Sequence, residues 1–154
     1  MKLRIACVGR LKEAHWRAAS DEYLKRMRPY ATVEVAEVGD RDITADAGRA
    51  MAAEGADLLR AIPDSSYVFA MDLTGREATS ERLSADLARL MVDGRSDITF
   101  VIGGSAGLSP AVLRRADERL ALSQMTLPHQ LARVVLLEQL YRAFRIMRNE
   151  PYHL

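Results

Sequence analysis

The run SYVFAMDL, residues 66–73, limits the possible folds of this chain more than any other segment. It is nearly continuous in apolar residues, whereas a strand with one face in water alternates apolar and polar positions. A continuous run is typical of a strand covered on both faces, as in a parallel sheet with helices on each side. The rest of the chain must therefore supply the strands and helices of such a sheet.

Strand-like and helix-like segments alternate along the whole sequence. Further strands are predicted at residues 3–8, 31–38, 97–104 and 118–124, and helices within 12–29, within 39–66, from Thr79 or Ser80 to before Gly94, after Pro110, and within 127–149. This order predicts an α/β fold with a mainly parallel sheet flanked by helices. The 154 residues contain no repeat or linker, so we expect one domain over residues 1–154.

Composition narrows the class of protein. The 22 basic and 21 acidic residues nearly cancel, so the chain lacks the basic excess of proteins that hold nucleic acid by charge alone. Its one cysteine, Cys7, cannot form a disulfide within the chain and suits a reducing cytoplasm. A small buried hydrophobic residue is the usual role for such a cysteine, rather than a nucleophile. We expect no signal peptide and no membrane-spanning segment.

A glycine-rich loop follows the predicted strand 97–104. In VIGGSAGLSP, Gly103, Gly104 and Gly107 precede Ser109 and Pro110, which together are a strong helix start. Ligands of parallel sheets bind beyond the carboxyl ends of the strands, and glycines leave backbone amides free to meet them. The spacing matches neither a dinucleotide fingerprint nor a phosphate-binding loop. A tight turn and a ligand site are equally compatible with it.

The carboxyl end of the strand 66–73 carries Asp72. Its carboxylate could bind a ribose hydroxyl or an ammonium group, or it could cap a turn at Thr74-Gly75, which is the commoner role.

The third candidate site is a set of polar residues at the strand-to-helix junction LSQMTLPHQLARV. Ser123, Gln124, Thr126 and His129 lie near a helix start marked by Pro128. The junction could be a helix start and nothing more. The helix dipole would disfavour the cationic form of His129, so we expect a neutral hydrogen-bonding side chain there.

The tail RNEPYHL follows a strongly apolar helix. Tyr152 and His153 are suited to stacking on bases and hydrogen-bonding to them, and Arg142, Arg145 and Arg148 could contact phosphates. The arginines could instead complement the helix dipole. The three histidines are scattered, and no Cys/His cluster has metal-ligand spacing, so we expect no metal site.

The motifs VIGGSAGLSP, LSQMTLPHQLARVVLLEQLYRA and NEPYH, in this order, resemble the ribosomal RNA large subunit methyltransferase H family of the SPOUT superfamily. The opening segments MKLRIACVGRLKE and EYLKRM are also similar, so the resemblance covers the whole chain. The family usually has a basic residue after Pro-Tyr-His, where this sequence has Leu154. That departure bears on a tail contact to RNA phosphate and not on the methyl-donor site.

The resemblance implies a C-terminal trefoil knot and a cytoplasmic homodimer without membrane, DNA or metal partners. It implies methyl transfer from S-adenosylmethionine to N3 of a pseudouridine in 23S rRNA on the assembled ribosome. By the same resemblance, the cofactor would contact Leu73, Gly103, Gly104, Gly107, Ser123, Gln124, Met125, Thr126, Leu127 and Pro128. Leu122, Met125 and Leu127 would enclose the adenine ring. Gly104 would lie nearest the cofactor, so a bulky residue there should abolish binding before it disturbs folding.

The resemblance also implies that Arg142, Tyr152 and His153 act on the target nucleotide. Our hypothesis is that His153 or Tyr152 helps N3 to lose its proton, while Arg142 steadies the developing negative charge. In a dimer, the tail of one subunit could reach the pocket of the other.

Two other functions stay compatible with the sequence. One is a SPOUT methyltransferase that acts on tRNA, and the other is a non-catalytic knotted module that binds RNA or an adenosine ligand. A dinucleotide-dependent oxidoreductase is disfavoured, because the glycine spacing is wrong and no early fingerprint is present.

Overall fold

The computed structural model describes residues 1–153, and Leu154, where the sequence departs from the family pattern, lies outside the described residues. Five strands form one sheet in the order β2-β1-β4-β3-β5, and every neighbouring pair is parallel. The strands are β1 Lys2–Val8, β2 Thr32–Val38, β3 Tyr67–Glu77, β4 Asp97–Ile102 and β5 Glu118–Ala121. The helices are α1 Ala14–Met27, α2 Ala47–Ala61, α3 Ser80–Val92, α4 Pro110–Arg115 and α5 His129–Met147.

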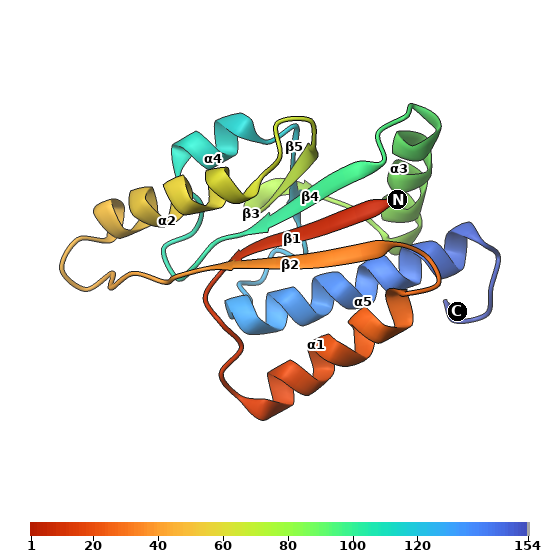
Figure 1. Ribbon diagram of the computed structural model, residues 1–154, viewed down its shortest axis with the longest axis horizontal. Coiled ribbons are helices and arrows are strands. Elements are labelled where there is room, and N and C mark those ends of the chain that lie inside the picture. The colour runs from red at the N-terminus through yellow and green to blue at the C-terminus, as the bar shows by residue number, and fades with distance from the viewer. Residues whose placement is uncertain (154) are drawn as a thin grey trace.

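Helices cover both faces of the sheet. Helices α1 and α5 lie on one face, and α2 and α4 lie on the other (Figure 1). Helix α3 packs against α5 and shares its side of the sheet. The predicted α/β fold with a parallel sheet and flanking helices is therefore confirmed.

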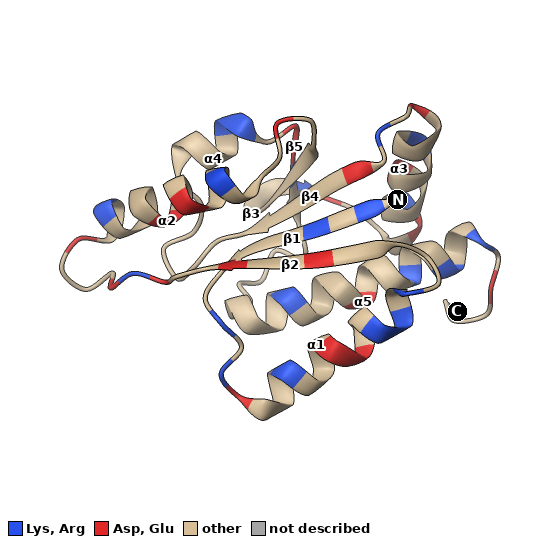
Figure 2. Ribbon diagram, in the orientation of Figure 1, with Lys and Arg blue, Asp and Glu red and all other residues tan. Residues whose placement is uncertain are grey.

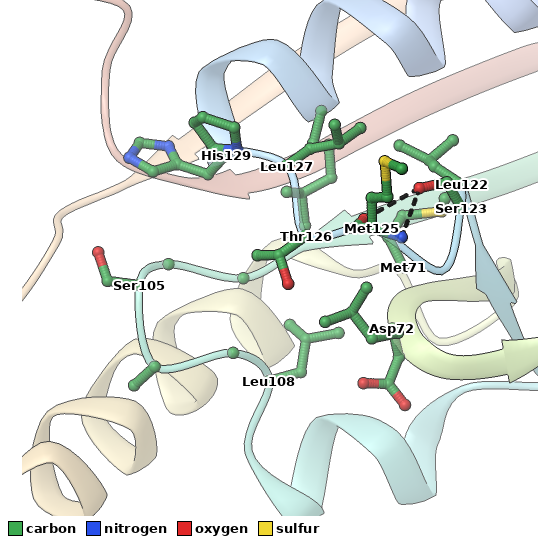
Figure 3. Close-up of a pocket in the computed structure, with 18 of the residues that line it drawn as sticks. Met71, Asp72, Ser105, Leu108, Leu122, Ser123, Met125, Thr126, Leu127 and His129 are labelled. Carbon is green, nitrogen blue, oxygen red and sulfur yellow. Dashed lines mark hydrogen bonds between the residues drawn. The ribbon is translucent and has the colours of Figure 1, made fainter.

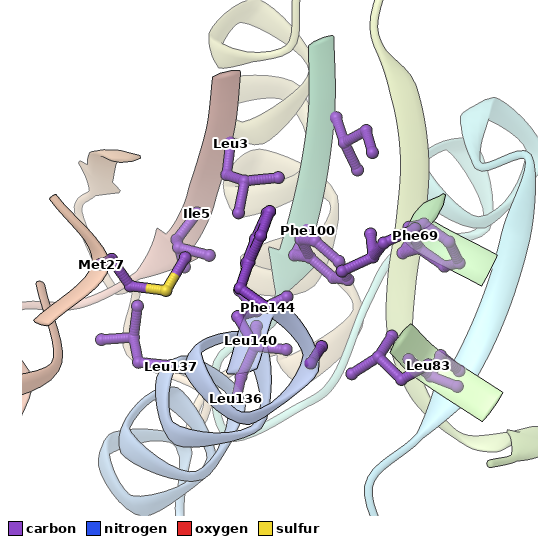
Figure 4. Close-up of a cluster of buried hydrophobic side chains, with 14 of the residues drawn as sticks. Leu3, Ile5, Met27, Phe69, Leu83, Phe100, Leu136, Leu137, Leu140 and Phe144 are labelled. Carbon is purple, nitrogen blue, oxygen red and sulfur yellow. The ribbon is translucent and has the colours of Figure 1, made fainter. Parts of the chain in front are cut away.

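The larger core lies between the sheet and the helices α1, α3 and α5. Leu3 and Ile5 of β1 pack there against Leu137 and Leu140 of α5 (Figure 4). At its centre the rings of Phe69 and Phe100 stack with their centroids 4.9 Å apart. Burying each such side chain contributes about 1.5–3 kcal/mol, so this layer is a major source of stability.

A second core fills the opposite face. Ala6, Val68, Ala70 and Val101 point toward α2 and α4, where side chains such as Leu58 and Val112 cover them. Neighbouring residues of β3 therefore enter opposite cores. This explains the uninterrupted apolar run at 66–73, as the sequence predicted.

Strand β3 is longer than the predicted segment 66–73. Its pairing with β5 jumps from Met71 to Arg76, which both lie opposite Leu120, so residues 72–75 form a bulge. The predicted turn at Thr74-Gly75 lies within this bulge, and the Thr74 hydroxyl donates a hydrogen bond to the Asp72 carboxylate. Asp72 therefore caps a turn, but the expected end of the strand was wrong.

Long-range contacts hold the second part of β3 in place. The Arg76 guanidinium donates to Glu118 at 2.9 Å and to Asp86 of α3 at 2.6 Å. A Cβ at Gly75 would lie 2.6 Å from the carbonyl carbon of Arg119, so only glycine permits this close approach to β5. Strand β5 ends at Ala121, earlier than predicted, and residues 122–128 form a loop.

Candidate functional site

A pocket of about 980 Å³ lies at the carboxyl ends of β3, β4 and β5. Its walls are the segments 71–74 and 102–108 together with the loop that leads from β5 into α5. Thr126 and Leu127 lie on one side of it, and Asp72 and Leu108 lie on the other (Figure 3). This is the edge of a parallel sheet where ligands bind, and the volume falls in the range of small-molecule sites.

The structure brings nearly all of the predicted cofactor residues to this pocket. Those that line it are Leu73, Gly103, Gly104, Gly107, Ser123, Met125, Thr126, Leu127 and Pro128. Leu122, expected to help enclose an adenine ring, also lines it. Gln124, which is exposed between Ser123 and Met125, does not line it. The roles of these residues as cofactor contacts stay predictions.

The glycine loop is both a tight turn and a pocket wall. The Gly107 N–H donates to the Gly104 carbonyl at 3.0 Å, and Gly107 has a φ of 85°, which favours glycine. A Cβ at Gly103 would lie 2.7 Å from the carbonyl carbon of Gly107. The tight turn is therefore confirmed, and the loop also lines the pocket, while its role as a ligand site stays a prediction.

Gly104 lines the pocket and also packs closely against β1 and α2. A Cβ there would lie 3.0 Å from Val8 Cγ1 and 3.1 Å from Glu54 Oε2. A side chain would therefore press on β1 and α2 rather than enter the open pocket. The expectation that a bulky residue at Gly104 abolishes cofactor binding before it disturbs folding stays a prediction. The close contacts add that packing against β1 and α2 should be affected as well.

Helix α2 approaches the glycine loop through the pair Glu54-Gly55. A Cβ at Gly55 would lie 2.2 Å from Ser109 Oγ, so glycine lets α2 reach the start of α4. Ser109 caps α4 there, as predicted, by accepting from the Val112 N–H at 3.3 Å. Glycine within a helix costs about 0.5–1 kcal/mol relative to alanine, which the close packing offsets.

Glu54 is a buried carboxylate beside the glycine loop that the sequence interpretation missed, although it does not itself line the pocket. Its side chain is 2% exposed, and its Oε2 accepts from the Arg41 backbone N–H at 3.0 Å. Its Oε1 is buried and has no hydrogen-bond partner among residues 1–153. The sequence did contain one signal for this residue. Glu54 is a charged residue next to a glycine, and it lies on the same face of α2 as the buried residues Ala50 and Leu58.

The loop after β5 is held by hydrogen bonds between the Ser123 side chain and the backbone of Met125. The Met125 N–H donates to Ser123 Oγ at 2.8 Å, and that hydroxyl donates to the Met125 carbonyl at 3.0 Å. The Met125 side chain is 79% exposed, and Leu73 across the opening is 54% exposed. Two large apolar side chains thus stand at the rim of the pocket.

His129 begins α5 and packs against the loop after β1. A Cβ at Gly9 would lie 3.1 Å from His129 Cε1. Burial lowers the pKa of His129, and the positive charge of Arg133 adds to this effect. The expected preference for a neutral His129 agrees with this direction, but burial is the main cause, where we expected the helix dipole.

Arg142, Tyr152 and His153 come together at the opposite end of α5. Arg142 Nε donates to Glu138 Oε1 at 2.9 Å, and the Tyr152 hydroxyl donates to the same oxygen at 3.1 Å. The Arg142 guanidinium lies 4.6 Å from the centroid of the Tyr152 ring. His153 Nε2 lies 2.7 Å from the Glu81 carboxylate, which joins the tail to α3.

This tail cluster does not reach the pocket of its own chain. Arg142 lies thirteen positions after His129 in α5, which is about 20 Å along the helix. Burial and the charge of Glu138 raise the pKa of Tyr152 to about 12, so its phenol stays neutral near pH 7. The predicted cofactor and catalytic residues therefore form two separate groups in one chain.

The other two tail arginines contact their own chain. Arg145 Nη1 donates to the Tyr30 hydroxyl at 2.9 Å and to Glu150 at 2.5 Å. Arg148 stacks on the Tyr30 ring with 4.6 Å between guanidinium and centroid. These contacts favour a structural role at the helix end over phosphate binding.

Charged side chains are dispersed over the molecule (Figure 2), and potential metal ligands do not gather in one place among the described residues. Basic and acidic residues are spread over the elements on both sides of the sheet (Figure 2). Within residues 1–153, no group of three or more histidine, cysteine or acidic side chains could hold a metal ion. No helix in this range is long and apolar enough to span a bilayer.

Comparison with known proteins gives a consistent picture. A family model described as a predicted SPOUT methyltransferase matches residues 1–153. The chain is 49% identical to ribosomal RNA large subunit methyltransferase H of Listeria monocytogenes, over 99% of each protein. It is also 49% identical to ribosomal RNA large subunit methyltransferase H 1 of Clostridium perfringens and 46% identical to the Listeria welshimeri protein, again over 99% of each.

Proposed function

The chain belongs to the SPOUT methyltransferase family, and from this premise we propose that it methylates N3 of a pseudouridine in 23S rRNA on the assembled ribosome. The methyl donor is S-adenosylmethionine. The names of the curated relatives, which refer to large-subunit ribosomal RNA, support this substrate class.

The observation that carries the proposal is the convergence of three loops on one pocket. The bulge of β3, the glycine loop after β4 and the loop after β5 all lie at one edge of the sheet. Apolar side chains such as Leu122 and Leu127 suit an adenine ring, while backbone groups of the glycine loop suit polar atoms. The unpartnered Glu54 oxygen beside this loop suits a cationic ligand. The residues present thus fit S-adenosylmethionine.

The bound cofactor supplies a methyl group already activated by its sulfonium. Transfer of this methyl group to N3 would require N3 to give up its proton. The protein must therefore hold N3 in line with the methyl group, which is mainly a matter of proximity and orientation. The three loops would hold the methyl donor. The target pseudouridine needs other groups, one that removes the N3 proton and others that position the nucleobase.

The tail cluster would supply those groups from a second subunit. Since about 20 Å of α5 separates Arg142 from His129 in one chain, a homodimer that seats one tail at the other pocket would complete the site. His153 is the better candidate for the base, because the raised pKa of Tyr152 keeps its phenol protonated. In this arrangement Tyr152 donates a hydrogen bond, and Arg142 steadies the negative charge on the target base.

Three further parts of the proposal concern architecture and location. We place residues 1–154 in one catalytic domain, and we expect the chain from β4 to α5 to form the trefoil knot of the superfamily. The position of β5 beside β3, with α5 returning across the sheet to β1 and β2, is compatible with that path. The single buried Cys7 suits a cytoplasmic protein.

Mass spectrometry of rRNA tests the proposal. A strain without this gene should carry one unmethylated pseudouridine in 23S rRNA, and the wild-type gene should restore the methyl group. Loss of a tRNA methyl group instead would favour the tRNA methyltransferase. If neither RNA changed while calorimetry still detected S-adenosylmethionine binding, the chain would be a non-catalytic binding module.

A further inference from the structure

Glu54 is a buried carboxylate behind the Gly104 wall of the pocket, and its contacts within residues 1–153 leave one oxygen unused. It lies in the middle of α2, and its exposure is 2%. One oxygen accepts the Arg41 N–H, and Oε1 has no partner within residues 1–153. An acceptor buried in this way is costly unless something donates to it.

No cationic side chain among the described residues pairs with Glu54. Its neighbour Asp57, one turn later on α2, has two such partners, because Arg41 and Arg60 both contact its carboxylate. The side chain of Arg41 thus binds Asp57, while only its backbone N–H serves Glu54. A buried acidic group without a cation is a feature of binding sites, where the ligand brings the missing charge.

Glu54 lies directly behind the part of the pocket wall that Gly104 forms. Both carboxylate oxygens lie close to Gly104, at 3.1 and 3.3 Å from the point where a Cβ would stand. Gly104 itself lines the pocket, and it has no side chain to separate the carboxylate from that loop. Gly55 brings α2 into this position, because any larger residue would collide with Ser109.

We propose that Glu54 recognises the α-ammonium group of the methionine part of S-adenosylmethionine, an inference that rests on the proposed function. The cofactor carries two positive centres, an ammonium and a sulfonium. Only the ammonium has N–H groups, and Oε1 lacks a hydrogen-bond donor. A charge-assisted hydrogen bond from the ammonium would satisfy this oxygen and neutralise the buried carboxylate.

Calorimetric titration with three ligands tests this assignment. S-adenosylmethionine and S-adenosylhomocysteine both carry the ammonium group, whereas 5′-methylthioadenosine lacks the amino-acid part. Glu54→Gln keeps the size of the side chain and removes its charge. It should weaken binding of the first two ligands by about tenfold or more, the usual effect of losing a hydrogen bond to a charged group, and leave 5′-methylthioadenosine unchanged.

Asp57→Asn is the matched control. It removes a carboxylate of the same helix that anchors Arg41 without facing Gly104, so it should change none of the three affinities. Equal weakening of all three ligands by Glu54→Gln would indicate a purely structural role and overturn the assignment. Weakening of S-adenosylmethionine alone would assign the carboxylate to the sulfonium and overturn it as well.

A ligand variant tests the same point in the unaltered protein. S-adenosylhomocysteine without its α-amino group should bind the wild-type chain at least about tenfold more weakly than the parent compound. Equal binding would overturn the proposal even if Glu54→Gln did not fold. Failure of the wild-type chain to bind S-adenosylmethionine at all would instead contradict the proposed function.

Discussion

Arg133 of α5 donates a 2.9 Å hydrogen bond to the backbone carbonyl of Gly9, and this contact fixes the start of α5 to the end of β1. The guanidinium is buried and also pairs with Glu37 at the end of β2 at 2.8 Å. One side chain thus ties two strand ends to the helix that carries His129.

Replacing Arg133 should destabilise the protein. In Arg133→Met the Gly9 carbonyl loses its donor and Glu37 loses its partner, so we expect the free energy of unfolding to fall by about 2–4 kcal/mol. Urea denaturation measures this change. Glu37→Gln keeps the bond to Gly9 and removes only a partly exposed charge, so its loss should be about 1 kcal/mol or less. Equal losses in both variants would contradict the role of the Gly9 contact.

The glycine loop should not tolerate added side chains at its first two positions. Gly103→Ala would place a methyl 2.7 Å from the Gly107 backbone, and we expect a loss of about 1–3 kcal/mol in the free energy of unfolding. Gly104→Val should lower stability and cofactor affinity together, because it presses on Val8 and Glu54. Thermal unfolding and calorimetry measure the two effects.

Gly48→Ala is the control for the glycine variants. Its added methyl would meet only Asp46 Oδ1 at 3.6 Å, an ordinary contact, within the first turn of α2. Stability should stay unchanged or rise slightly, since alanine favours a helix more than glycine does. Gly104→Val with wild-type stability and no cofactor binding would indicate an effect on binding alone at this position.

Cys7 should be chemically inert in the folded protein. Burial raises the pKa of its thiol to about 11, although the nearby positive charge of Arg133 acts in the opposite direction. The thiolate is the reactive form, so iodoacetamide at pH 8 should modify the unfolded chain and spare the native one. Mass spectrometry of intact protein checks this, and rapid native modification would contradict it.

The same pKa predicts a pH effect on stability. Because the folded value lies above the ordinary thiol value of 9.0, Cys7 contributes stability that is complete below pH 9 and is lost as the pH rises toward 11. Cys7→Ala should remove this part of the alkaline destabilisation. Denaturation curves of both proteins between pH 8 and pH 11 test the difference, and parallel losses in the two would refute it.

Variants of the tail residues His153 and Tyr152 should differ in their rates of single-turnover methylation at saturating rRNA. If His153 takes the N3 proton, His153→Ala should lower the rate by about 10²–10⁴-fold. Tyr152→Phe removes only the hydrogen bond to Glu138 and should have a smaller effect, with an unchanged pH profile between 6 and 9, because the phenol is not ionised there. A normal rate for His153→Ala would rule out its role as base.

The homodimer has its own test. Mixing His153→Ala with a variant that cannot bind cofactor should restore activity in mixed dimers, since one pocket would again receive an intact tail. Glu54→Gln can be used as the variant that does not bind cofactor only if calorimetry shows that it has lost its affinity for S-adenosylmethionine. A mixture as inactive as its parents would indicate that each tail serves the pocket of its own chain.

Short-range features were readable from the sequence because their causes lie within a few residues. The run at 66–73 predicted a strand covered on both faces, since side chains of a strand alternate between its two sides. Thr79 and Ser109 predicted helix starts, because each accepts from a backbone N–H three residues later. The carboxyl-end rule drew attention to the ends of β3 and β4, where a turn and a ligand site were both compatible with the sequence. Only the resemblance to a family predicted a cofactor site there and specified its residues.

Tertiary structure decided what depends on distant partners. Arg76 returns β3 to the sheet through Glu118 and Asp86, and neither pairing leaves a local pattern. Glu54 looked like an ordinary helix residue until the fold buried it beside Gly104. His129 and Arg142 lie far apart because both belong to the single helix α5. This distance separates the predicted cofactor residues from the predicted catalytic residues, which the family motifs do not distinguish by position. Sequence determines which groups are present and which local turns they favour, whereas only packing determines which of them meet.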